Sequence, residues 1–90
     1  MPAKFRLSSF LTKNILHLQM LGEFDGSAAC ELITRIEEDG SGASQILIDT
    51  TGLRSIHPFG KTVFQNRIGP LSRKMFSLTF VGKFKHQFES

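Results

Sequence analysis

The sequence predicts an α/β fold, in which residues 1–90 form a single domain built on a mixed β-sheet with helices. Segments with the two-residue alternation of strands are interspersed with segments whose apolar residues recur every three or four positions, as in helices. The first two strands are joined by a short turn, which makes them antiparallel. The later strands follow helical crossovers, which makes them parallel. Ninety residues are enough for one small domain with its own core.

The N-terminal quarter of the chain predicts a β-hairpin. Residues 5–11 alternate loosely, as in an edge strand, and residues 15–21 alternate cleanly, with Thr12-Lys13-Asn14 as the turn between them. The face expected to be buried consists of Leu16, Leu18 and Met20. His17 falls on the opposite, polar face. No second His or Cys stands at ligand spacing, so we expect a surface histidine and no metal site.

A first helix is expected after the hairpin. Asp25-Gly26-Ser27 is typical of a helix start, with either Asp25 or Ser27 as the N-cap. Apolar residues with helical spacing follow, at Ala29, Leu32, Ile33 and Ile36. Three acidic residues and then Gly40-Ser41-Gly42 predict that the helix ends in a flexible loop.

The middle of the chain predicts a central strand and a second helix. Residues 46–48 are a continuous apolar run, typical of a strand covered on both faces, and residues 49–52 predict a polar turn. Pro58 suits the first position of a helix, and Gly69-Pro70 predicts its end. The stripe expected to be buried on this helix consists of Gly60, Val63, Phe64, Arg67 and Ile68.

Two further elements complete the predicted fold. Residues 76–81 alternate as a last strand, with Phe76, Leu78 and Phe80 on one face. Residues 83–89 predict a third helix, because Phe84 and Phe88 are four positions apart.

The net charge of +3 is unevenly distributed along the sequence. Through Asp49 there are seven acidic and four basic residues, whereas from Thr50 to Phe88 there are seven basic residues and no acidic one. This asymmetry could create a surface for an acidic partner, an anion or nucleic acid, or the side chains could simply solubilise the last helices and loops. The basic residues are scattered rather than clustered, so we do not expect nucleic acid as a partner.

The composition also predicts the environment of the protein. No apolar run approaches the roughly 20 residues that span a bilayer, and the first ten residues lack the apolar stretch of a secretory signal. Cys30 is the only cysteine, which excludes an internal disulfide and a cysteine-based zinc site. We therefore expect a soluble, cytoplasmic protein with no membrane insertion and no cofactor.

Three segments of the sequence together carry a resemblance. Residues 16–25 resemble a strand that ends in Gly-x-hydrophobic-Asp, residues 46–53 a central hydrophobic strand with its Asp and turn, and residues 80–82 the end of a last strand. In this order and spacing they resemble the STAS domain, the fold of anti-sigma-factor antagonists and of the cytoplasmic domains of sulfate transporters. The resemblance covers almost the whole chain and implies a regulatory protein as partner, such as a kinase, a phosphatase or a sigma-factor pathway component.

The resemblance also implies a final helix beyond Ser90. A truncated chain, a minimal variant of the domain and a homo-oligomer whose self-association covers the exposed sheet are the three explanations left open for this short C-terminus.

Phosphorylatable STAS domains carry Asp-Ser-Ser/Thr-Gly at the start of the second helix, where a partner kinase modifies a hydroxyl. Counting from Asp49 places His57-Pro58-Phe59-Gly60 in that register. Gly60 is kept, but the acid and both hydroxyl positions are lost, so the resemblance implies that the usual switch cannot operate. Asp49-Thr50-Thr51-Gly52 imitates the motif, but it follows the strand directly and is expected to be a polar turn.

Residues 55–62 also suggest an enzyme, because they differ from the phosphate-binding loop pattern only at its first glycine. Such a loop wraps backbone N–H groups around phosphates. Here Ser55 replaces the glycine, Pro58 removes a donor and Phe59 adds bulk. No nucleophile and base can be paired from the sequence either, because Cys30 lies on a predicted helix and His57 cannot be placed beside it. We therefore expect no catalytic residues.

The sequence thus predicts a non-catalytic module that binds a partner protein at the N-terminus of its second helix. Phe59 falls outside the apolar stripe of that helix, so its ring is expected to meet a neighbouring loop or another molecule. The candidate partner-binding residues are Asp25, His57, Pro58, Phe59, Gly60 and Lys61. The alternative is a ligand-responsive module that binds an anion or nucleotide at this helix N-terminus, with Arg54, Lys61 and Thr62 as the candidate cradle.

Overall fold

The order of strands and helices in the computed structural model, which describes residues 4–72 and 77–89, confirms the predicted order. The elements are β1 (Phe5–Thr12), β2 (Ile15–Phe24), α1 (Gly26–Asp39), a 3-10 turn (Gly40–Gly42), β3 (Gln45–Ile56), α2 (Pro58–Ser72), β4 (Ser77–Val81) and α3 (Lys85–Glu89). Phe76, predicted in the last strand, lies outside the described residues. None of the described helices combines the length and the apolar composition needed to cross a bilayer.

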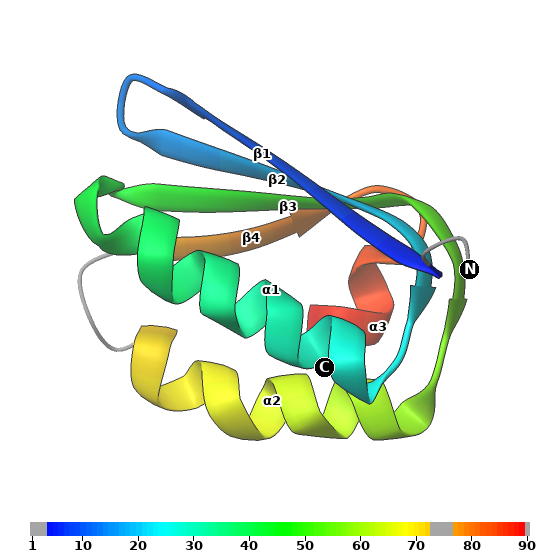
Figure 1. The fold of residues 1–90 in the computed structure, drawn as a ribbon. Coiled ribbons are helices and arrows are strands. Elements are labelled where there is room, and N and C mark those ends of the chain that lie inside the picture. The colour runs from blue at the N-terminus through cyan, green and yellow to red at the C-terminus, as the bar shows by residue number, and fades with distance from the viewer. Residues whose placement is uncertain (1–3, 73–76, 90) are drawn as a thin grey trace.

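The four strands form one mixed sheet in the order β1-β2-β3-β4. β1 and β2 pair antiparallel as the predicted hairpin, while β2 and β4 both run parallel to β3. All three described helices lie on the same side of this sheet (Figure 1). Of the described elements, none covers the opposite face.

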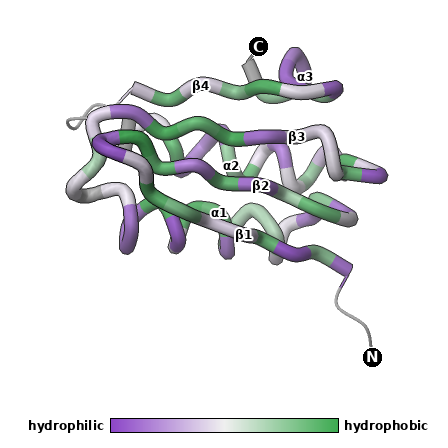
Figure 2. The backbone as a smooth tube through the Cα atoms, turned by 90° about the horizontal axis from the view of Figure 1, so that it is seen from above, coloured by the Kyte–Doolittle hydropathy of each residue, from purple (hydrophilic) through white to green (hydrophobic). Residues whose placement is uncertain are grey.

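The prediction that the central strand is covered on both faces is wrong, because the helices lie on one side of the sheet. Along β3, Ile46, Ile48 and Thr50 are buried toward the helices, whereas Leu47 and Asp49 between them are half-buried on the open face. Figure 2, which looks onto the sheet, shows hydrophobic stretches along β2 and β3. The continuous apolar run at residues 46–48 therefore reflects one covered face and one partly apolar open face.

The polar turn predicted at residues 49–52 is also wrong, because this segment continues β3 as far as Ile56. Thr50 is fully buried, yet its hydroxyl is satisfied. Its Oγ1 donates to the Val81 carbonyl at 2.9 Å and accepts from the Phe84 N–H at 3.0 Å. A polar side chain with both partners supplied by a neighbouring element is compatible with a buried strand.

Two predicted helix ends differ from the structure. The segment Gly40–Gly42 is a 3-10 turn rather than a flexible loop, and the Gly40 N–H donates to the Ile36 carbonyl. α2 passes through Gly69-Pro70 and ends at Ser72. Pro70 removes one backbone donor from the last turn, where the helix ends two residues later.

The helices and the sheet enclose one hydrophobic core. The predicted buried faces of β2 and α1 are confirmed, but on α2 Arg67 is exposed and does not belong to the buried stripe. Four rings form the centre of the core, with centroids 5.0–6.3 Å apart, and we call them the aromatic cluster. Its members are Phe24, Phe64, Phe80 and Phe88. Phe88 belongs to the short α3, so this helix closes one end of the core.

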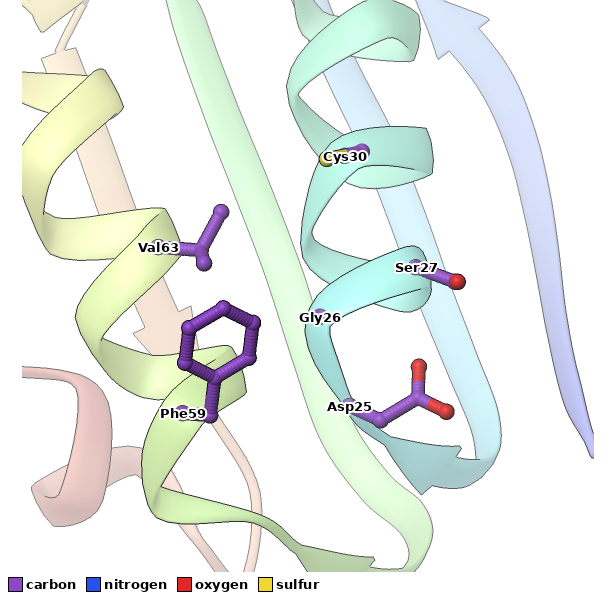
Figure 3. A pocket seen from close by; sticks show the side chains of 6 residues that line it. All are labelled: Asp25, Gly26, Ser27, Cys30, Phe59 and Val63. Carbon is purple, nitrogen blue, oxygen red and sulfur yellow. The ribbon is translucent and has the colours of Figure 1, made fainter.

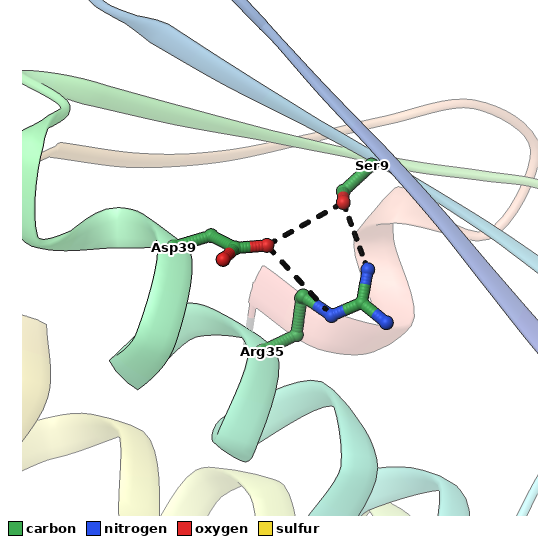
Figure 4. A network of polar contacts seen from close by, with 3 residues as sticks. All are labelled: Ser9, Arg35 and Asp39. Atoms are coloured by element: carbon green, nitrogen blue, oxygen red, sulfur yellow. Dashed lines mark hydrogen bonds and ion pairs between the residues drawn. The ribbon is translucent and has the colours of Figure 1, made fainter.

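A polar network ties the edge strand β1 to α1 (Figure 4). The Arg35 Nη1 donates to the Ser9 Oγ at 2.8 Å, and the same hydroxyl lies 3.5 Å from the Asp39 Oδ2. Arg35 Nε is 3.8 Å from this carboxylate oxygen. These contacts fix the C-terminal half of α1 beneath the hairpin, while the N-terminal half of α1 lies beside α2.

Candidate functional site

The N-terminal ends of α1 and α2 are in direct contact, which brings most of the predicted site residues together. The His57 N–H donates to the Phe24 carbonyl at 2.9 Å, so the segments that lead into the two helices are joined. Gly60 is buried against the Asp25 backbone. A Cβ atom at Gly60 would lie 2.7 Å from the Asp25 carbonyl oxygen, so only glycine permits this approach without a shift.

Asp25 shapes this junction as the N-cap of α1. Its Oδ1 accepts a hydrogen bond from the Ala28 N–H at 2.9 Å. Of the two predicted caps, Asp25 is therefore the residue used, and Ser27 is exposed. The Asp25 carboxylate points away from the Phe59 ring (Figure 3). A partner-binding role for Asp25 stays a prediction.

Phe59 is the most exposed large hydrophobic residue among those described, with 70% of its surface accessible. Its ring lies against the start of α1, because a Cβ atom at Gly26 would lie only 2.8 Å from the ring. The ring therefore contacts the start of a neighbouring helix rather than a loop, yet most of it faces outward.

Phe59 forms one side of an open hollow of about 640 Å³ between the two helices, which we call the α1–α2 groove. Its lining residues are Asp25, Gly26, Ser27, Cys30, Phe59 and Val63. Figure 3 shows Phe59 and Val63 on α2 facing Gly26 and Cys30 on α1. Beside the groove, the Arg67 Nη1 donates to the Cys30 Sγ at 3.6 Å.

Cys30 and Val63 were not predicted from the sequence to belong to a site, and Arg67 was predicted to lie in the core. A signal was present, because Phe59, Val63 and Arg67 are spaced by four along α2 and thus share one side of the helix. This side adjoins the buried stripe centred on Phe64 and turns toward α1.

Lys61 belongs to a different surface from Phe59. With Thr62 it lines a second hollow of about 290 Å³, whose other lining residues are Ile56, Pro58, Gln65 and Gln87. The Thr62 hydroxyl donates to the Pro58 carbonyl at 3.1 Å. Arg54 is exposed on β3 and does not line this hollow. The structure thus brings two of the three candidate anion-binding residues together.

His57 is exposed at the start of α2, with its Nε2 3.9 Å from the Glu23 Oε1. It is the only residue between β3 and α2. Residues 55–62 therefore pass directly from strand to helix and form no loop that could wrap a phosphate. Within residues 4–72 and 77–89, no three His, Cys, Asp or Glu side chains gather as metal ligands would.

Comparison with known proteins gives a match at the level of structure. No family model matches the sequence, and no curated protein matches it either. An anti-sigma-factor antagonist STAS domain from Rhodobacter sphaeroides superposes with a TM-score of 0.72 at 13% identity, over 98% of this chain and 94% of the other.

Two further solved structures have the same architecture. An anti-sigma-factor antagonist from Mycobacterium paratuberculosis gives a TM-score of 0.65 at 14% identity, covering 88% of this chain and 68% of its own. The anti-sigma-factor antagonist SpoIIAA in its unphosphorylated form gives 0.62 at 17% identity, covering 84% and 70%. The chain therefore has the STAS fold, and the resemblance found in its sequence is confirmed at that level.

Proposed function

We propose that this protein is a non-catalytic regulatory module that binds a partner protein at the N-terminal ends of α1 and α2. The observation that carries the proposal is Phe59, a large aromatic side chain left 70% exposed beside an apolar groove. Exposed aromatic residues next to a hollow are typical anchors of protein interfaces. The partner expected from the STAS fold is a regulatory protein of the cytoplasm, such as a kinase, a phosphatase or a sigma-factor pathway component.

The geometry around Phe59 supports the binding of a partner protein rather than catalysis. The ring lies against Gly26, and this contact limits the positions that it can adopt in the free protein. The lining of the groove beside it is mostly apolar and includes Cys30 and Val63. Such a surface favours a shape-matched apolar contact with a protein.

Backbone NMR of the labelled protein tests this proposal directly. The titrants are purified kinases, phosphatases and sigma-factor regulators encoded beside its gene. We expect one of them to shift resonances at residues 25–30 and 57–63, on both sides of the α1–α2 groove. Shifts confined to the open face of the sheet would contradict the proposal.

We further propose that this interaction is not switched by phosphorylation at the usual position, because Pro58 and Phe59 carry no hydroxyl. Exposed hydroxyls do remain nearby, at Ser55 and Thr62. After incubation with candidate partner kinases and ATP, mass spectrometry should find no phosphate on residues 55–62. Phosphate on Ser55 or Thr62 would mean that a hydroxyl beside the usual position is used.

A second candidate function is the binding of an anion or nucleotide beside Lys61. The hollow that Lys61 and Thr62 line is also lined by Gln87, whose amide N–H groups are of the type that donates hydrogen bonds to phosphate oxygens. In this case, titration with ATP or inorganic phosphate would shift the NMR resonances of the residues that line this hollow. The shift would be smaller at high salt, and Lys61→Ala would abolish it. Unchanged spectra at millimolar ATP would exclude this candidate.

A further inference from the structure

The α1–α2 groove has an apolar wall and the acidic Asp25 in its lining, and a positive charge lies beside it. On α2, Phe59 and Val63 face α1, and Arg67 follows one turn after Val63, about 6 Å further along the helix. Arg67 reaches toward α1, where its Nη1 donates to the Cys30 Sγ at 3.6 Å. The guanidinium group therefore lies beside the groove.

The hydrogen bonding of Arg67 leaves capacity for a stronger acceptor. A guanidinium has five N–H donors, and a thiol sulfur is a weak acceptor. In the part of the chain that the structure describes, no carboxylate lies within ion-pair distance of Arg67. The sequence also has no acidic residue from Thr50 to Phe88, so α2 presents no negative charge there. A carboxylate supplied from outside could form the paired contact that arginine favours.

Building on the proposed function, we propose that the groove binds a helix of the partner protein with a defined pair of side chains. An apolar residue of that helix contacts Phe59 and Val63, and an Asp or Glu about one turn away pairs with Arg67. Val63 and Arg67 lie one turn apart on α2, which matches residues three or four positions apart on a partner helix running alongside, and Phe59 lies one turn further from Arg67. Arg67 then decides which partner helix is accepted, while Phe59 supplies the apolar contact.

Selection from a phage-displayed library of helical peptides with randomised surface positions tests this pairing. Peptides selected on the wild-type protein should share an apolar residue and, three or four positions away, Asp or Glu. Selection on Arg67→Glu should replace this acid with Lys or Arg. Lys85→Glu is the matched control, because Lys85 is an exposed cation on α3, outside the groove, and its selected peptides should keep the acid.

The affinity of a selected peptide gives the size of the effect. Arg67→Glu should weaken the wild-type-selected peptide by about tenfold to a hundredfold, the range for losing hydrogen bonds to a charged group. Exchanging the acid of the peptide for Lys should restore binding to Arg67→Glu. Peptides without an acidic preference, or with the same preference on both targets, would overturn the proposal.

Cys30 reports where these peptides bind, because it lines the groove and is the single cysteine of the chain. A selected peptide should protect its thiol from N-ethylmaleimide. Peptides that leave Cys30 fully reactive would bind elsewhere and would also overturn the proposal. Peptides that protect Cys30 and depend on Phe59 but carry no acid would overturn the role of Arg67 while leaving the proposed function intact.

Discussion

Two phenylalanines on the same helix have opposite surroundings. Phe64 is 1% exposed at the centre of the aromatic cluster, whereas Phe59, five residues earlier on α2, is 70% exposed beside the α1–α2 groove. Five residues correspond to one full helical turn plus about 140°, so the two side chains point in clearly different directions around the helix axis. The difference shows that residue type does not set the role of an aromatic side chain in this protein; its angular position on α2 does.

The contacts of the two rings explain what each can contribute. The Phe64 ring packs edge-on against Phe24, Phe80 and Phe88, with centroid distances of 5.7–6.3 Å. These neighbours come from β2, β4 and α3, so this ring joins three elements. Phe59 lies against Gly26 at the N-terminus of α1 and is otherwise largely exposed. We therefore expect Phe64 to determine stability and Phe59 to determine binding.

The largest effect is expected for Phe64→Ala. The substitution leaves a cavity in a core that has few ways to collapse, and it should lower the free energy of unfolding by about 3 to 5 kcal/mol. Urea denaturation followed by circular dichroism measures this change. Phe59→Ala is the matched control on the same helix, and a loss of similar size there would contradict the division between the two rings.

Thr50→Val should have the next largest effect. It tests how far the buried hydroxyl, which bonds to the segment leading into α3, stabilises the protein. The change keeps the shape of the side chain but removes the partner of the Val81 carbonyl and of the Phe84 N–H. We expect a loss of about 1 to 3 kcal/mol in the free energy of unfolding. Thr51→Val, at the exposed neighbouring position, should change it by less than about 0.5 kcal/mol.

Thr50 also shows which parts of the fold could be predicted from the sequence. Alternation and helical spacing identified the order of the elements and the buried faces of β2 and α1, because burial imposes these periods locally. The extension of β3 through Thr50 was missed, since the partners that satisfy its hydroxyl come from residues more than 30 positions away. The continuation of α2 to Ser72 was also missed, because Gly69-Pro70 was interpreted as the end of the helix, whereas a helix tolerates proline in its last turn.

The placement of the candidate site residues could be predicted only in part. Counting from Asp49 placed residues 57–60 at the start of α2, where the structure has them, and Phe59 lies outside the core, in agreement with its absence from the predicted stripe. The opposite wall of the groove could not be predicted, because it requires knowing that Cys30 on α1 lies beside α2. The separation of Lys61 from Phe59 into two different hollows also depends on where α3 lies.

Phe59→Ala tests the other side of the comparison. The truncated ring leaves no buried cavity, so the melting temperature should stay close to that of the wild type, while partner binding weakens by about 1 to 3 kcal/mol. A thermal melt and a calorimetric titration on the same protein give both numbers. A strongly lowered melting temperature with unchanged affinity would assign Phe59 to the core and remove the groove from the proposed function.

The smallest effect is expected for Asp25→Ala. This substitution measures how much the N-cap of α1, at the junction of the two helices, contributes to the free energy of unfolding. The Asp25 carboxylate caps α1 by accepting from the Ala28 N–H, and loss of such a cap costs about 0.5 to 2 kcal/mol. Asp25→Asn keeps an acceptor oxygen and should recover most of this loss. Ser27→Ala, the change at the other cap suggested by the sequence, should leave the free energy of unfolding nearly unchanged, because Ser27 is exposed. If Asp25→Ala also leaves affinity for the partner unchanged, the carboxylate serves only to hold α1 in place, and recognition at this junction depends on the exposed ring and the groove beside it.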